Sequence, residues 1–142
     1  MTCMVREAEI VYGKKEIEVP DRIHSDNEVA RILRDYGIAD KTQENFVAIC
    51  LDAQHRPVAI HTVAIGTASS VTVHPRDVFR VAVMSGASAV ILGHNHPSGS
   101  ILESADDRAL TQRMVDAGKL LGIPVLDHVI VTPNGDHVTL IP

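Results

Sequence analysis

The pattern of apolar positions along the chain predicts a series of short strands. Two continuous apolar runs rich in β-branched residues, 46–51 and 58–65, are separated by a polar turn, which favours a pair of buried antiparallel strands. A third run, 88–93, predicts another buried strand. Runs at 125–131 and 137–141 flank a Pro-Asn-Gly-Asp turn and predict the last two strands.

Three segments instead show helical spacing and helix-terminal residues. Ser25 and Glu28 form a capping-box pattern, and Gly37 ends the apolar repeat, so the sequence predicts a helix over 26–36. The His74-Pro75 pair is typical of a second helix start. Ser104 caps a third helix, which ends at Gly122.

The N-terminal part of the chain gives a weaker pattern. Residues 8–12 and 16–19 are interpreted as two short extended segments around a turn at 13–15, and residues 1–24 carry no motif. A chain of 142 residues is the usual size of one domain, so we expect a single domain, 1–142, with residues 1–24 as a variable extension. The first residues lack the apolar core of a signal peptide, and no apolar run approaches the ~20 residues that span a bilayer, so we expect a cytoplasmic protein without membrane association.

Charge and cysteine content exclude several classes of function. With 13 Lys+Arg against 18 Asp+Glu the formal charge is -5, which disfavours strong nucleic-acid binding. Cys3 and Cys50 form no C-x-x-C pattern, so neither a disulfide framework nor a cysteine-based zinc site is supported.

Two histidines at the end of the 88–93 run are the first candidates for chemistry. In an extended backbone His94 and His96 point to the same side and can face one ion. Eight histidines scattered at random would give roughly 0.4 such pairs, so the pair alone could equally be two solvated loop residues. Ser104 and Asp107 complete the pattern H-x-H-x7-S-x2-D, which is far more specific.

Two imidazoles and one carboxylate suit a catalytic zinc site. They leave a fourth tetrahedral position for water, which structural zinc sites do not. The sequence therefore predicts one zinc ion per chain, bound by His94, His96 and Asp107. The alternative for Asp107 is a carboxylate that only interacts with the helix dipole.

The same residues resemble the JAMM motif of the JAB/MPN metalloproteases, and most closely the bacterial RadC family. The resemblance covers residues 40 to 142 and rests on Gln43 to Phe46, Val73 to Phe79, Gly93 to Gly99, Ser104-x-x-Asp107, Leu121 to Ile123 and Asp127-His128. It implies an α/β (α+β) fold of the JAB1/MPN, cytidine deaminase-like architecture, with a mixed, mainly antiparallel sheet flanked by helices. It also implies zinc on His94, His96 and Asp107, Glu44 as the general base and Ser104 as a stabilising residue.

Chemistry gives Glu44 and Ser104 roles that agree with the resemblance. A carboxylate beside a metal could accept a proton from water and deliver it to a leaving amine, although Glu44 could also be a solvated residue at a strand end. The Ser104 hydroxyl is either a helix cap alone or a cap that also donates to an oxyanion.

Other polar residues nearby receive no catalytic role. Asp106 is expected to be solvated, and Asn95 to turn away from the histidines. The Asp127-His128 pair either contributes a carboxylate that orients a ligand imidazole or is polar core structure.

These observations leave two functions open. The first is a zinc-dependent peptidase or isopeptidase that acts on a protein or peptide substrate. The second is an MPN-type interaction module, or a metal-dependent factor associated with DNA repair, without peptidase activity. A zinc deaminase would need H-x-E with P-C-x-x-C, and neither is present.

Overall fold

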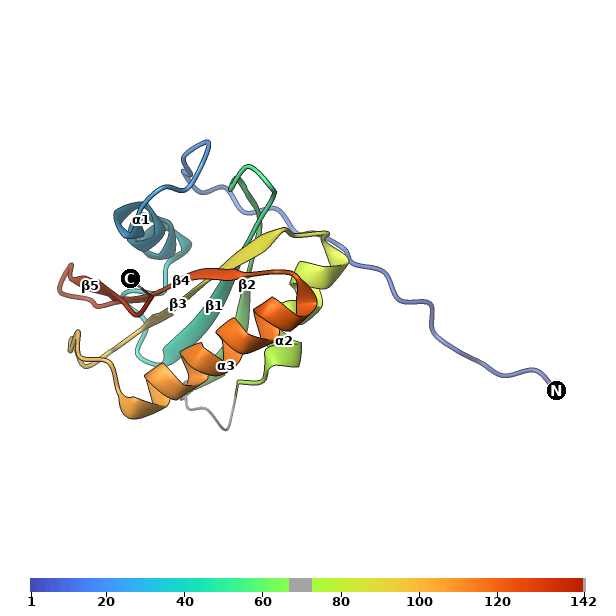
Figure 1. Cartoon of the computed structure of the whole chain (residues 1–142). Coiled ribbons are helices and arrows are strands. Elements are labelled where there is room, and N and C mark those ends of the chain that lie inside the picture. The colour runs from blue at the N-terminus through green and yellow to red at the C-terminus, as the bar shows by residue number, and fades with distance from the viewer. Residues whose placement is uncertain (67–72, 142) are drawn as a thin grey trace.

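A computed structural model of the chain describes residues 1–66 and 73–141, and the strands among them form one mixed sheet. The strand order is β2-β1-β3-β4-β5, and only β3 and β4 are parallel (Figure 1). The α/β fold with a mainly antiparallel sheet is thus confirmed. The strands are β1 (Glu44–Leu51), β2 (Pro57–Gly66), β3 (Ala89–Asn95), β4 (Val125–Val131) and β5 (His137–Thr139).

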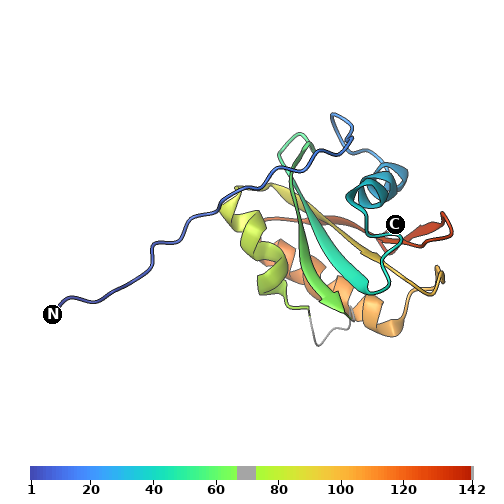
Figure 2. The same cartoon turned by 180° about the vertical axis from the view of Figure 1, so that it is seen from behind.

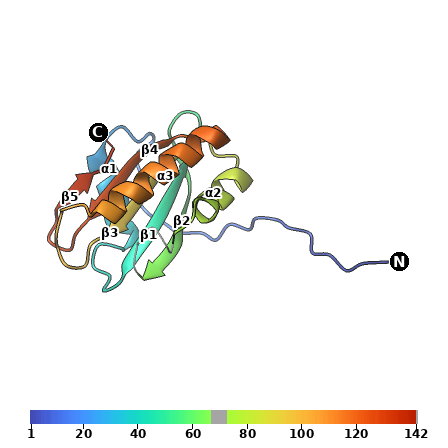
Figure 3. The same cartoon turned by 60° about the horizontal axis from the view of Figure 1, so that its bottom comes forward.

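Helices cover both faces of this sheet. Helix α1 (Asp26–Tyr36) lies on one face, and α2 (Pro75–Met84) and α3 (Ala105–Leu121) lie on the other (Figures 1 and 2). Figure 3 shows α2 and α3 next to each other across the strands. Alternate side chains of β1 point to opposite faces of the sheet and so contribute to the core on both. Phe46, Ala48 and Cys50 pack under α2 and α3, whereas the intervening residues pack under α1.

The predicted helix ends are confirmed for α1 and α3. Ser25 accepts a hydrogen bond from the backbone N–H of Glu28, and Gly37 adopts the left-handed conformation that ends α1. Ser104 and Gly122 do the same for α3. The parallel β3–β4 pair requires a crossover connection, and α3 supplies it.

Three sequence-based expectations about strands are wrong. Residues 8–12 and 16–19 are not strands, because none of the ladder pairs among the described residues involves a residue before Glu44. The strand predicted at 88–93 does not end before the histidines. It continues to Asn95, because β1 and β4 both pair with His94 and β4 also pairs with Asn95. The last strand is also shorter than expected and ends at Thr139.

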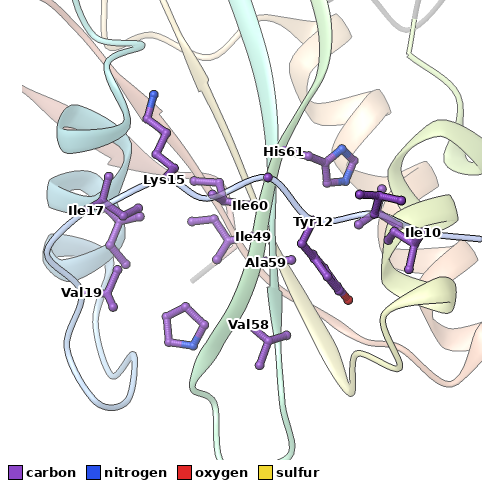
Figure 4. A pocket seen from close by; sticks show the side chains of 15 residues that line it. Ile10, Tyr12, Lys15, Ile17, Val19, Ile49, Val58, Ala59, Ile60 and His61 are labelled. Atoms are coloured by element: carbon purple, nitrogen blue, oxygen red, sulfur yellow. The ribbon is translucent and has the colours of Figure 1, made fainter.

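The N-terminal segment crosses the α1-side face of β1 and β2 and encloses an apolar hollow (Figure 4). This hollow has a volume of about 500 Å³, and its walls include Tyr12, Ile17, Ile49 and Ile60. None of the candidate metal ligands lines it. Among residues 1–66 and 73–141, no helix combines the length and the apolarity that a bilayer span requires.

Candidate metal centre

The structure brings His94, His96 and Asp107 together at the C-terminal end of β3. The Nε2 atoms of His94 and His96 lie 3.1 Å apart, and each lies 3.3 Å from one oxygen of the Asp107 carboxylate. The exposed fractions are only 0% for His94, 9% for His96 and 5% for Asp107. Three metal-ligating groups therefore converge at one buried point, as the spacing predicts.

The hydrogen bonds that cap helix α3 orient the carboxylate of Asp107. The backbone N–H of Ser104 donates to Asp107 Oδ2 at 2.9 Å, and the backbone N–H of Asp107 donates to Ser104 Oγ at 3.0 Å. This reciprocal pair is a capping box in which an aspartate takes the place of the usual Glu or Gln. The bonds that start α3 thus also direct the carboxylate toward the histidines, while Asp106 is exposed as expected.

The two histidines reach the site from an extended backbone. His94 is on β3, and His96 directly follows its last residue, Asn95, so in an extended backbone both imidazoles point to the same side. Phe46, which is opposite His94 in the β1–β3 ladder, stacks on the His94 ring with centroids 5.8 Å apart. The sheet register therefore fixes the position of the His94 ring.

A backbone carbonyl determines which nitrogen of His96 carries the proton. His96 Nδ1 lies 2.9 Å from the carbonyl oxygen of Ser100. Because a carbonyl only accepts, Nδ1 must donate, and in the neutral ring Nε2 then holds a lone pair. That lone pair points toward the Asp107 carboxylate and His94.

The electrostatics of the three groups favour a cation between them. Burial by itself would raise the pKa of Asp107, but the neighbouring His94 and His96 imidazoles and a hydrogen bond from the Ser104 backbone hold it well below its usual range. The bond to Asp107 raises the pKa of His96 against the opposing effect of burial, and the charge of Glu44 adds to this. An ionised carboxylate beside two imidazole nitrogens attracts positive charge at neutral pH.

The chemistry of this donor set fits zinc. Two imidazole nitrogens and one carboxylate oxygen lie within 4.8 Å of one another. Zinc accepts both donor types and leaves a fourth position open in such sites. Neither cysteine belongs to this cluster, since Cys3 is exposed and Cys50 is buried in the apolar core.

Glu44 lies on the same side of the sheet as the candidate ligands. It is two residues before Phe46 on β1, so the two side chains share a face, and Phe46 stacks on His94. The Glu44 side chain is half-buried, and its charge contributes to the raised pKa of His96. The predicted base and the predicted zinc ligands thus lie on the same face of the sheet.

Asn95 has a role that the sequence did not indicate. Its Oδ1 accepts from the backbone N–H of Asn45 at 2.6 Å, and its Nδ2 donates to the carbonyls of Gln43 and Lys41 at 3.1 and 3.3 Å. These bonds hold the backbone on both sides of Glu44. Alternation along the strand indicates that Asn95 turns away from the histidines, but only the β1–β3 register shows what it meets.

His128 on β4 contacts a candidate ligand directly. Its Nε2 lies 2.7 Å from His94 Nδ1, and its Nδ1 lies 2.6 Å from Thr111 Oγ1 on α3. The side chain is fully buried, and burial lowers the pKa of His128 well below its usual value. A neutral imidazole in this position can orient His94.

The alternative in which the Asp127 carboxylate orients a ligand imidazole is wrong. This carboxylate accepts from Thr139 Oγ1 and from the backbone N–H of His128. Successive side chains of a strand point to opposite faces, so Asp127 turns away from the face on which His128 meets His94. Burial raises the pKa of Asp127, which fits a structural role.

Comparison with known proteins shows the family to which the chain belongs. The sequence profile of the RadC-like JAB domain matches residues 23–140. The chain belongs to this family. The motif resemblance found in the sequence is thereby confirmed for RadC-like proteins.

Several UPF0758 proteins are similar to this RadC-like domain. The UPF0758 protein of Rubrobacter xylanophilus is 46% identical over 94 residues, which cover 66% of this chain and 41% of the relative. That of Desulforamulus reducens is 43% identical over 97 residues, or 68% of this chain and 43% of the relative. That of Thermotoga maritima is 38% identical over 122 residues, or 85% and 54%. The chain thus spans about half of the length of these relatives, and their names state no activity.

Proposed function

We propose that this RadC-like domain is a zinc-dependent hydrolase that cleaves an amide bond in a protein or peptide, as a JAMM-type metallopeptidase or isopeptidase. The convergence of His94, His96 and Asp107 beside Glu44 carries this proposal. A module used only for binding has no need of three buried ligands that leave a coordination position open.

In this proposal the three ligands hold one zinc ion per chain. When bound, zinc supplies Lewis-acid chemistry, since it polarises a carbonyl and makes water acidic enough to react near neutral pH. The capping box and the Phe46 stack orient Asp107 and His94 through contacts within the protein itself. This preorganisation favours binding because little side-chain freedom remains to be lost.

Glu44 moves the proton. Its carboxylate accepts a proton from the attacking water and later delivers that proton to the leaving amine, so one group serves as base and then as acid. The bonds of Asn95 to the flanking backbone keep Glu44 in place for both steps.

Ser104 stabilises the negative oxygen that develops on the substrate. Its Oγ accepts from the Asp107 N–H, so its own hydroxyl proton is still available for donation. Ser104 is exposed at the start of α3, where a substrate carbonyl can approach it. An oxyanion donor of this kind typically contributes about 10²- to 10³-fold in rate.

Two substitutions separate these roles. Glu44→Gln keeps the size of the side chain but cannot accept a proton, so we expect full zinc occupancy with turnover lowered by about 10²- to 10⁴-fold. Asp107→Asn weakens a ligand, so zinc and activity should fall together. Asp106→Asn, at the exposed neighbouring position, is the matched control and should change neither.

The measurement works without a known substrate. Cell extract is incubated with each variant, and mass spectrometry quantifies new peptide N-termini, which report peptide-bond cleavage, and newly freed lysine side chains, which report isopeptide-bond cleavage. Zinc is measured by elemental analysis. If Glu44→Gln loses its zinc, Glu44 is a ligand rather than a base. If wild-type protein with full zinc produces no more cleavage than Glu44→Gln, the proposed hydrolase activity is wrong.

A further inference from the structure

A continuous chain of buried hydrogen bonds connects helix α3 to the candidate ligand His94. It runs from the Asp107 carbonyl through Thr111 and His128 to His94. We infer that Thr111 and His128 are positioning residues, which place the proton of His94 on Nδ1 and so leave Nε2 free to bind the metal. This inference rests on the metal site of the proposed function.

The donor and the acceptor in each hydrogen bond follow from the Asp107 carbonyl, at which the series begins. The backbone carbonyl of Asp107 can only accept, so Thr111 Oγ1, at 2.7 Å, donates its single proton there. Thr111 then has only lone pairs for His128 Nδ1 at 2.6 Å, and His128 must donate from that nitrogen. The proton of a neutral His128 is thereby assigned to Nδ1.

The same logic continues to the ligand. With its proton on Nδ1, His128 has an acceptor at Nε2, which lies 2.7 Å from His94 Nδ1. His94 must therefore donate from Nδ1, and its Nε2 presents a lone pair toward His96 and Asp107. Ser100 enforces the same arrangement at His96, so both imidazoles aim lone pairs at one point.

If the hydrogen bonds ran in the opposite direction, His94 could not bind the metal through Nε2. If Thr111 donated to His128, the proton of His128 would move to Nε2 and that of His94 would move to the nitrogen that faces the other ligands. A protonated nitrogen cannot bind a metal ion. The Asp107 carbonyl can only accept a hydrogen bond, and it accepts that of the Thr111 hydroxyl. This bond selects the direction of donation that leaves His94 Nε2 without a proton.

Buried packing holds the side chains of this hydrogen-bond series in place. Thr111 is 6% exposed and His128 is fully buried, and Phe46 packs edge-on against the His128 ring with centroids 5.4 Å apart. The chain also starts at the backbone of Asp107, which is itself a candidate ligand. One connected set of bonds therefore joins the backbone of the ligand on α3 to the ring of the ligand on β3.

Paired substitutions separate hydrogen bonding from packing. Thr111→Val keeps the shape of the side chain but removes the hydroxyl, whereas Thr111→Ser keeps the hydroxyl but removes a methyl group. We expect Thr111→Val to weaken zinc binding and Thr111→Ser to bind like the wild type. Zinc dissociation constants come from competition with a chromogenic chelator, after circular dichroism has established that each variant is folded.

A second pair tests His128 itself. His128→Phe removes the acceptor for His94 Nδ1 and should weaken zinc binding by about 10- to 100-fold, the usual effect of losing a group that orients a metal-binding histidine. In His128→Gln the amide oxygen can replace Nε2 as the acceptor, so this variant should restore most of the affinity. Equal zinc affinities for Thr111→Val and Thr111→Ser, or a greater loss of affinity in Thr111→Ser, would show that Thr111 acts only through packing. Either result would overturn the inference.

Nitrogen-15 NMR of the imidazoles in the metal-free wild-type protein gives a readout that needs neither zinc nor activity. The inference predicts that His94 carries its proton on Nδ1, and a proton on Nε2 overturns it. Zinc binding and the predicted proton position without any hydrolysis would contradict the proposed function alone. Zinc-dependent hydrolysis with His94 protonated on Nε2 in the metal-free state would contradict this inference alone.

Discussion

Asp107 illustrates how one residue can meet a structural and a chemical requirement with the same atoms. Its backbone N–H and its carboxylate complete the capping box of α3, and the same carboxylate lies 3.3 Å from both histidine Nε2 atoms. The helix-dipole alternative and the ligand hypothesis are therefore compatible. A carboxylate fixed by the helix start loses little freedom when it binds a metal ion.

At the residue scale, fixed spacing was predictable and contacts across strands were not. The offsets between His94, His96 and Asp107 follow from one strand end and one helix start, both of which are local features. The roles of Asn95 and His128 depend on which strands lie beside β3 and in which register. No local pattern carries that information.

Asn95 gives a prediction at this scale. Asn95→Ala removes the acceptor for the buried N–H of Asn45, and an unsatisfied buried donor costs about 1–3 kcal/mol of unfolding free energy. Urea denaturation measures the loss. Asn27→Ala, at an exposed position on α1, is the control and should change the free energy by less than about 0.5 kcal/mol. Equal stability of the two variants would remove the structural role assigned to Asn95.

At the element scale, β1 and β3 organise the molecule. Both strands are buried almost throughout, and their alternating side chains contribute to the core clusters on the two faces of the sheet. Continuous apolar runs predicted these strands because strands covered on both faces have no polar side. The N-terminal segment also alternates, but without a strand beside it this alternation does not produce a strand.

The crossing of α3 over the chain before β4 depends on the absence of a side chain at Gly118. A Cβ there would lie 2.5 Å from the Ile123 carbonyl oxygen and 3.3 Å from the Val125 nitrogen. Both contacts are with backbone, which cannot move aside as a side chain can.

We therefore expect Gly118→Ala to lower the free energy of unfolding by about 1–3 kcal/mol, despite the better helix propensity of alanine. Denaturant unfolding is the measurement. Gly13→Ala, where nothing lies within 4 Å of the added Cβ, is the matched control. A Gly118→Ala variant at least as stable as the wild type would contradict the close approach of α3.

At the scale of the whole molecule, the apolar core does not depend on the metal site. Two clusters, one on each face of the sheet, bury residues from every helix and from most strands. The three ligands lie at the end of β3 rather than within the centre of either cluster. In this respect the chain differs from small domains that fold only around their metal.

Removal of the metal should therefore leave the fold intact. After chelation the far-ultraviolet circular dichroism spectrum should keep its helix and strand signals. The melting temperature should fall, because a ligand present at 100 times its Kd stabilises the folded state by about 2.7 kcal/mol. A random-coil spectrum after chelation would mean that the zinc is structural.

The most direct test of the central claim is the zinc content of the purified protein. Wild-type protein prepared without chelator should contain one zinc ion per chain by elemental analysis, and the His94→Ala, His96→Ala double variant should contain none while it remains folded. A wild-type protein without zinc, or a double variant that keeps a full equivalent, would contradict the assignment of the metal to His94, His96 and Asp107.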